Sequence, residues 1–230
     1  MSISTLTTPN GSVALLTSRQ MLAQQGKVFV ATNPTPGTAI AYANKTAWSA
    51  TANGLFSLFN GNAAGGANIY LDRLKLIQTA TAPTGGLVTR FELFTETGNV
   101  ALTGAALAVT PVNLLNGPGA ATTAATVTFF SAGAGTIAAA VGTRKQVFVG
   151  SLASGVNVTH DSWTFAFGSD DIAGGTAPLT AARATGPADL VAGCPPITVA
   201  PQSSVWFNLW GLTPASNVPS YEFALTYIEV

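Results

Sequence analysis

Residues that could perform acid–base or nucleophilic chemistry are few in this chain. It contains one histidine, His160, and one cysteine, Cys194, and nothing in the sequence brings the two together. Asp161 follows His160 and could orient an imidazole, but adjacent residues of a strand point to opposite faces, so we interpret the pair as part of a loop. The glycine patterns of nucleophile elbows and phosphate-binding loops do not occur. We therefore expect a protein that is not an enzyme, with Cys194 as a small buried residue.

Metal-binding side chains are equally sparse. One cysteine and one histidine fall short of the usual ligand set of a structural zinc site. Calcium takes several carboxylate and carbonyl oxygens, and the candidates here are Asp170 and Asp171 in a Gly-rich stretch, with Asp161 and Asp189 nearby in sequence. Their spacing does not match an ordered calcium-binding loop, so we interpret the stretch as a solvated loop. We expect no metal site and no cofactor.

Aromatic side chains offer a third kind of chemistry, because exposed rings can stack on sugars. The residues that could form such a platform are Trp48, Trp206, Trp210, Tyr42 and Tyr221. For Trp163 and Trp206 we expect core packing instead, since large aromatic side chains supply much of a β-sandwich core. Trp210 precedes Gly211 near an expected turn, so Trp210 and Tyr221 are the candidate contacts for a sugar or a protein partner.

Charge is scarce along the whole chain of 230 residues. Nine Lys and Arg residues balance nine Asp and Glu residues, so only 8% of the residues are charged, against about 25% in ordinary soluble proteins. A free monomer usually keeps more charge for solubility. The composition therefore favours a protein whose surface is covered by copies of itself or by a partner. Clustered Lys and Arg residues are lacking, so we expect no nucleic-acid partner.

One long stretch, between Glu96 and Arg144, carries no charge at all. Its most apolar part, residues 127–141, is interrupted by Ser, Gly and Thr, whereas a membrane-spanning helix needs about 20 mainly apolar residues. We expect no membrane partner and interpret the stretch as β structure and loop that is buried or faces an interface.

The start of the chain differs from the rest. Its first five residues, MSIST, lack the basic and apolar regions of a signal peptide. The pattern favours one helix, over residues 13–25, which stops before Gly26. We expect residues 1–25 to form an N-terminal arm and residues 26–230 to form a single β-sandwich domain.

After residue 26, short apolar runs alternate with turns rich in Gly, Pro and Asn, which is typical of antiparallel β structure. Strands are expected at residues 27–32, 38–43, 55–59, 68–79, 87–96, 101–110, 125–130, 146–152, 162–167, 197–200, 204–210 and 221–230. They predict two packed sheets, an all-β antiparallel sandwich of jelly-roll type. Long Gly/Ala/Thr loops are expected at residues 60–67, 113–125, 131–143 and 168–193, and such loops either contact a partner or are mobile.

Three strand details can be tested. Residues 68–79 and 87–96 form the clearest expected antiparallel pair, across which Arg73 or Lys75 would face Glu92. Asp72 interrupts the apolar face of the first strand, which indicates a bulge or an edge. Both faces of residues 204–210 are apolar, so both are expected to be covered.

These features resemble structural proteins of tailed bacteriophage particles, in particular the capsid decoration, or cement, class. The resemblance lies in the stretches ITVAPQSSVWFNLW at residues 197–210 and YEFALTYIEV at residues 221–230, in the two strands at 68–79 and 87–96, and in the arm before a neutral sandwich. It implies a homotrimer with a jelly-roll-like fold that binds the major capsid protein. It also implies a place on the capsid surface of the virion after synthesis in the host cytoplasm.

The function that we expect from this resemblance is structural: a decoration protein that binds the outer capsid surface and stabilises the shell. Residues 1–25 would reach onto a neighbouring subunit. Two alternatives stay open. One is another virion component, such as a capsid jelly roll or a tail or fibre protein. The other is a carbohydrate-binding β-sandwich module, or a hydrolase on a β scaffold.

Overall fold

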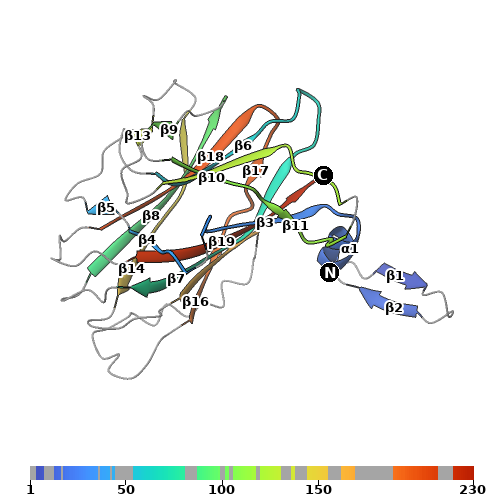
Figure 1. Cartoon of the computed structure of the whole chain (residues 1–230), viewed down its shortest axis with the longest axis horizontal. Coiled ribbons are helices and arrows are strands. Elements are labelled where there is room, and N and C mark those ends of the chain that lie inside the picture. The colour runs from blue at the N-terminus through green and yellow to red at the C-terminus, as the bar shows by residue number, and fades with distance from the viewer. Residues whose placement is uncertain are drawn as a thin grey trace.

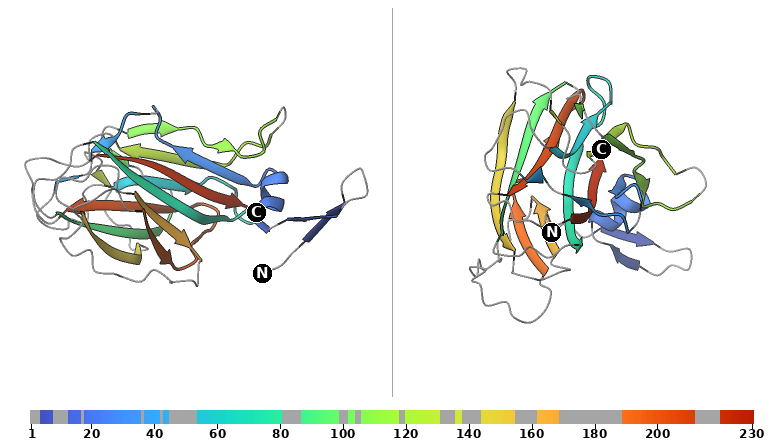
Figure 2. Two further views of the ribbon diagram at one scale, coloured as in Figure 1. Left: turned by 90° about the horizontal axis from the view of Figure 1, so that it is seen from below. Right: turned by 60° about the vertical axis from the view of Figure 1, so that its left-hand side comes forward.

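Two large β-sheets packed face to face make up most of the structure, which is a computed structural model (Figures 1 and 2). It describes residues 4–7, 13–16, 18–35, 37–41, 43–44, 54–80, 87–98, 102–103, 106–117, 120–130, 136–137, 144–154, 162–168, 189–211 and 220–230. Strands dominate these residues, and one short helix, α1 (Ser18–Gln24), precedes the sheets. The expected all-β antiparallel sandwich is confirmed.

The first sheet has eight strands. In order across the sheet they are β11 (Val112–Asn113), β3 (Val28–Thr32), β19 (Ser220–Glu229), β7 (Ile69–Ala80), β15 (Ser162–Phe167) and β16 (Asp189–Cys194), with β17 (Thr198–Val199) beside β7 and β4 (Ile40–Ala41) beside β19. Neighbours along this order are antiparallel except β15 and β16, which run parallel. The prediction of a loop at residues 168–193 is therefore wrong at its end, because residues 189–193 belong to the edge strand β16.

The second sheet has seven strands. In order they are β10 (Ala106–Val109), β12 (Ala125–Phe130), β6 (Gly54–Asn60), β18 (Ser203–Gly211), β8 (Leu87–Thr97) and β14 (Lys145–Ser154), with β5 (Ala43–Asn44) parallel to β18. Two small two-stranded sheets complete the described strands: β1 (Ser4–Thr7) with β2 (Val13–Leu16), and β9 (Leu102–Thr103) with β13 (Thr136–Ile137).

Eight of the long strands follow a jelly-roll order. We count β3, β6, β7, β8, β14, β15, β18 and β19 as first to eighth. The first sheet then places the first, eighth, third and sixth side by side, and the second sheet places the second, seventh, fourth and fifth side by side. Most connections therefore cross from one sheet to the other, as in two interlocked Greek keys. The expected jelly-roll order is confirmed.

This order separates the two strands that the sequence indicated as a pair. β7 lies between β19 and β15 in the first sheet, whereas β8 lies between β18 and β14 in the second. Glu92 consequently lies opposite Asn208 and Val149, and not opposite Arg73 or Lys75. The expected pairing was wrong because the chain crosses between the sheets after β7 instead of turning back beside it.

Asp72 does form a β-bulge, as its place in the apolar face indicated. Leu71 lies opposite Tyr227 and Arg73 opposite Thr226, so Asp72 is the extra residue in β7. One extra residue shifts the inside–outside alternation by one position. The buried apolar residues accordingly change parity along the strand, as Ile69, Leu71, Leu74 and Leu76.

Aromatic rings fill the space between the sheets. Phe129 of the second sheet stacks on Phe223 of the first with ring centroids 3.6 Å apart, and Phe91 meets Phe165 at 4.8 Å. The core also contains Phe56, Phe207, Trp163, Tyr221 and Tyr227, all less than one-tenth exposed. These contacts fix which strand of one sheet lies over which strand of the other.

The N-terminal segment differs from the single expected helix. Residues 13–16 form β2 and pair with β1, and the helix begins only at Ser18. The expected stop is confirmed: Gly26 has a positive φ of 69°, its N–H donates to Ala23, and the N–H of Lys27 donates to Leu22. This is the hydrogen-bond pattern of a glycine C-cap, which releases the chain into β3.

Candidate interaction surface

The stretch without charge, residues 97–143, is one structural insertion between β8 and β14, and we call it the uncharged insertion. β8 and β14 are neighbours in the second sheet. Between them the chain reaches the opposite side of the sandwich, where β12 and β10 extend the second sheet and β11 extends the first. The insertion thus builds one side of the molecule from residues that carry no charge.

A buried ion pair closes the base of this insertion. Glu96, the last charged residue before it, accepts from Arg144, the first one after it, with Nη2 at 2.8 Å and Nε at 2.9 Å from the same Oε2 atom. The Glu96 and Arg144 side chains are only 1% and 9% exposed. Arg144 also lies over the ring of Trp206, 4.6 Å from its centroid, and Trp206 stacks on Phe94 at 4.3 Å. The pair therefore joins both ends of the insertion on the outer face of the second sheet.

That stack also covers the second face of β18. Val205 and Phe207 point into the core between the sheets, and Trp206, between them in sequence, is fully buried on the other face. The expectation that both faces of residues 204–210 are covered is confirmed up to Asn208, which is 2% exposed. Trp206 is a packing residue and not part of an exposed platform.

A network of side-chain hydrogen bonds holds the far end of the insertion. The Glu229 carboxylate, at the end of β19, accepts from Thr123 Oγ1 at 2.6 Å and from Asn62 Nδ2 at 2.9 Å. The Tyr227 hydroxyl donates to Thr123 Oγ1 at 3.0 Å. A Cβ on Gly61 would come within 2.7 Å of the Ala124 carbonyl oxygen, so the close approach of the two loops requires glycine there.

The same network fixes the loop at residues 60–67. Asn60, fully buried, donates through Nδ2 to the carbonyl oxygens of Ala67 and Val199, both at 2.9 Å. Gln202 Nε2 donates to the Asn62 carbonyl oxygen at 2.8 Å. These bonds tie the loop, which was expected to contact a partner or to be mobile, to three other segments of the chain.

Between these two anchors the uncharged insertion exposes aliphatic side chains. Val112, Leu114 and Leu115 are 61%, 49% and 40% exposed. Beside them lies a groove of about 490 Å³, which we call the insertion groove, lined by residues of 109–117 and 120–126. Asn113 Nδ2 braces it by donating to the carbonyl oxygens of Ala121 and Gly26, both at 2.9 Å. The groove is therefore a built feature that presents no charge.

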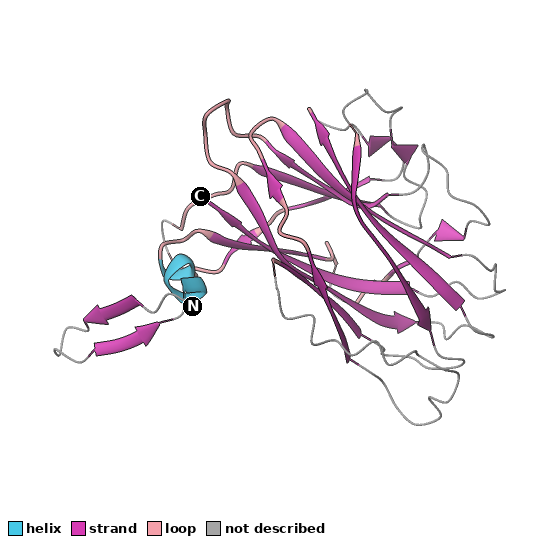
Figure 3. Ribbon diagram, turned by 180° about the vertical axis from the view of Figure 1, so that it is seen from behind, coloured by secondary structure: helices cyan, strands magenta, loops and turns pink. Residues whose placement is uncertain are grey.

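The N-terminal arm leaves the sandwich next to this groove. Its hairpin, β1 and β2, extends beyond α1 and away from the two large sheets (Figures 2 and 3). Arg19 of α1 forms an ion pair with Asp72, the bulge residue of β7. The Asp72 side chain is only 7% exposed. The bulge therefore places a buried carboxylate where the helix at the root of the arm can bind it.

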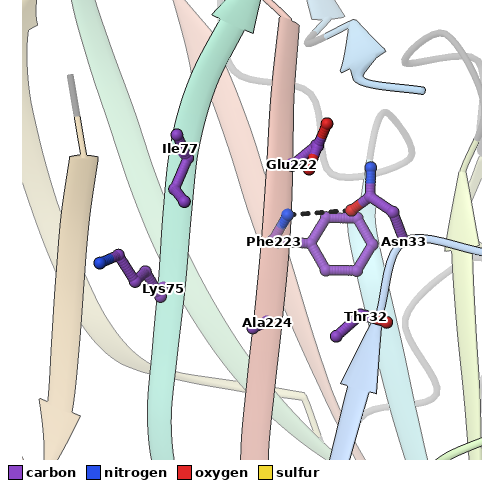
Figure 4. A pocket seen from close by; sticks show the side chains of 7 residues that line it. All are labelled: Thr32, Asn33, Lys75, Ile77, Glu222, Phe223 and Ala224. Carbon is purple, nitrogen blue, oxygen red and sulfur yellow. Dashed lines mark hydrogen bonds between the residues drawn. The ribbon is translucent and has the colours of Figure 1, made fainter. Parts of the chain in front are cut away.

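A second, smaller pocket of about 310 Å³ lies on the outer face of the first sheet (Figure 4). It is lined by Thr32, Asn33, Lys75, Ile77, Glu222, Phe223 and Ala224. Asn33 Oδ1 accepts from the Phe223 N–H at 2.9 Å and so joins two of the strands that line the pocket. The charged side chains of Lys75 and Glu222 point apart, so they do not converge on one ligand position.

The candidate residues from the sequence are not brought together. Tyr221 is 1% exposed and packs edge-on against Trp163, with ring centroids 5.4 Å apart. A buried ring cannot stack on a sugar, so Tyr221 is a core residue and its proposed contact role is wrong. The backbone of Trp210 lies in β18, opposite Arg90, but its side chain lies outside the described part of the structure.

The described part of the structure does not bring the candidate catalytic and metal-binding residues together either. Cys194 is buried, as expected, and burial raises the pKa of its thiol from 9.0 to about 12. Asp189 begins β16, whereas His160, Asp161, Asp170 and Asp171 lie outside the described residues. The sequence analysis did not predict the ion pair between Glu96 and Arg144. Their positions at the two ends of the uncharged stretch are the signal from which the pair could have been predicted.

Comparison of the chain with protein-family models, with curated proteins and with solved structures finds no match. Within the described ranges, no three His, Cys, Asp or Glu side chains lie close enough together to hold a metal ion. In those same ranges, no helix is long and apolar enough to cross a membrane. The surface described above must therefore be interpreted from its own geometry.

We expect the Glu96–Arg144 pair to be essential for stability. Arg144→Met and Glu96→Gln should each lower the free energy of unfolding by about 3–5 kcal/mol, because each leaves a buried polar partner without its counterpart. The double variant should cost less than the sum of the two. Urea denaturation measures all three, with Lys145→Met at the neighbouring exposed position as the matched control. Single variants as mild as this control would contradict the role of the pair.

Stability is also expected to fall at alkaline pH. An unfolded Cys194 ionises near its ordinary pKa of 9.0, whereas the folded thiol stays protonated up to about 12. Its contribution is therefore complete below pH 9 and lost as the pH rises toward 12. The pKa of Tyr227 is raised as well, by burial and by the nearby Glu229 carboxylate, against the lowering effect of its bond to Thr123.

Urea unfolding at a series of pH values measures this effect. Cys194→Ala should weaken the alkaline dependence, because it removes one of the two groups that drive it. A free energy of unfolding that stays constant through the alkaline range would contradict the buried state of both groups.

Proposed function

We propose that this protein is a structural subunit that packs against other protein subunits, and that it acts as a decoration protein on the outer surface of a virus shell. The observation that carries the proposal is the exposure of aliphatic side chains on two opposite sides of the sandwich. One side is the uncharged insertion with Val112, Leu114 and Leu115, and the other is β14 with Val149, which is 51% exposed.

The inter-sheet contacts establish that these are opposite sides. Phe148 of β14 meets Phe165 of β15, with centroids 6.2 Å apart, so β14 lies near the β16 edge of the first sheet. Phe129 of β12 stacks on Phe223 of β19, so β12 and β10 lie near the β11 edge. Both sides also end in strands with no further neighbour among the described strands, and such edges can pair with another chain.

Two different contact sides suit an extended assembly. When unlike surfaces of neighbouring copies meet, the contacts generate rings or lattices instead of a simple dimer. A shell offers the same surface many times, so weak contacts made by every copy add up to strong attachment. Stabilisation of a shell would follow from bridging between its subunits, without any chemical step.

The scarcity of charge lowers the energetic cost of such contacts. Burying a charge at an interface costs several kcal/mol unless it is paired, whereas Val and Leu side chains gain by leaving water. The uncharged insertion contributes no charge to be buried. The jelly-roll order supports the proposal by analogy alone, because viral capsid proteins use this fold and so do lectins.

The proposal is tested first by self-association. Sedimentation velocity over a wide range of concentrations should give a defined oligomer, which we propose to be a trimer. Leu115→Glu should weaken it, because a charge would have to be buried in the contact, whereas Thr198→Glu at an exposed position of β17 serves as the control. A monomer at every concentration would argue against a subunit of an assembly.

Shell binding is the second test. Empty shells assembled from the major capsid protein of the same genome should co-sediment with this protein and become more resistant to heat. If the protein associates with itself but never binds these shells, another virion part, such as a tail or fibre component, becomes the better assignment.

A further inference from the structure

The arm and the groove raise one question about assembly: which part of a neighbouring copy does each of them contact? We propose that the β1–β2 hairpin of one copy lies in the insertion groove of a neighbouring copy. This inference rests on the proposed function, because it needs copies that associate.

The hairpin has no partner strand in its own chain among the described residues. β1 and β2 form a separate two-stranded sheet, paired from Ser4 with Leu16 to Thr7 with Val13. Figures 2 and 3 show it extending from the body beyond α1. An isolated two-stranded hairpin is only marginally stable in water, and it gains stability by packing on or pairing with another surface.

The direction of the hairpin is set by α1. One residue, Thr17, separates the end of β2 from the start of α1. The helix is fixed at its start by the Arg19–Asp72 ion pair and at its end by the glycine cap at Gly26. Figures 2 and 3 show the hairpin leading away from the two large sheets, so its natural contact is a neighbouring molecule.

The groove and the hairpin match in charge. The chain has no charged residue before Arg19 and none between Glu96 and Arg144. A contact between these two segments therefore buries no ionic group and pays no charge desolvation. By contrast, the pocket on the first sheet would place Lys75 and Glu222 near the hairpin.

The groove also offers backbone groups to a strand. β11 pairs with β3 on one side and has no described neighbour on the other, and β10 is likewise the last described strand of its sheet. A strand of the hairpin can add to either edge by main-chain hydrogen bonds, with specificity from the side chains that it buries. Leu114 and Leu115 beside the edge are exposed and available for that contact.

The root of the arm lies next to the groove of the same copy. Gly26, two residues after the end of α1, accepts from Asn113, and a Cβ placed on it would lie 3.4 Å from Leu115 Cδ2. In a ring of copies, each arm therefore starts beside the groove of its own copy and ends in the groove of the next copy. Head-to-tail contacts of this kind are all identical and can close into a ring.

Directed crosslinking between two versions of the full chain tests the inference. In a Cys194→Ala background, one version carries Thr5→Cys in the hairpin and the other, with a tag that changes its mass, carries Asn116→Cys in the groove. Mild oxidation of the mixture should give a mixed disulfide dimer as the main product. Thr5→Cys mixed with Thr198→Cys is the matched control and should give at most a trace of it.

Sedimentation of the same samples separates the two levels of the proposal. Association without the mixed disulfide would overturn the arm–groove contact and leave the structural function standing. A crosslink that forms only when both cysteines are in one chain would also overturn it. If the chains do not associate at all, the arm–groove contact and the proposed function fail together.

An energetic test adds a second criterion. Deletion of residues 2–17 and Leu115→Glu should each weaken self-association by about tenfold or more. The two changes together should do no more than either alone, because they remove the same contact. Fully additive losses would show that hairpin and groove act at different contacts, and would overturn the inference.

Discussion

The stacking of aromatic rings between the two sheets is the interaction on which the rest of the molecule depends. Phe129 on Phe223 and Phe91 on Phe165 set the sheets against one another, and every connection that crosses between the sheets is placed by that contact. A core of this kind needs no ionic group. It therefore allows a stable fold in a chain of which only 8% is charged.

Five of the charged residues stand at junctions between segments. Glu96 and Arg144 close the base of the uncharged insertion, Glu229 holds its far end through Thr123, and Arg19 with Asp72 fixes the helix that carries the arm. These charged side chains hold segments of the chain in position. The side built by the insertion is left with aliphatic and small polar groups, and this is the feature that the proposed function uses.

Sequence periodicity predicted the sheets better than their connections. Local patterns of apolar and polar residues predicted the long strands, the bulge at Asp72 and the burial of both faces of β18. The pairing of residues 68–79 with 87–96 did not, because a jelly roll sends successive strands to different sheets and no local pattern records that crossing. β16 was missed since its residues, DLVAGC, show neither alternation nor aromatic content and it lies parallel to its neighbour.

The surface could be predicted in part. The absence of charge between Glu96 and Arg144 marked the insertion as buried or interface-facing, but its path along the edges of both sheets depends on contacts far apart in sequence. Tyr221 was a candidate contact because exposed aromatic rings can stack on sugars, and residue type alone does not say whether a ring is covered. Tyr221 of β19 is buried against Trp163 of β15, two strands away in the same sheet.

Hydrogen–deuterium exchange tests the central claim most directly, which is that neighbouring protein covers the uncharged insertion. Exchange of backbone amides is compared between concentrated, assembled protein and protein diluted until it dissociates. The account predicts that residues 106–117 exchange more slowly in the assembled state, while core residues 54–60 of β6 are unchanged. Equal exchange of residues 106–117 in the two states would contradict it.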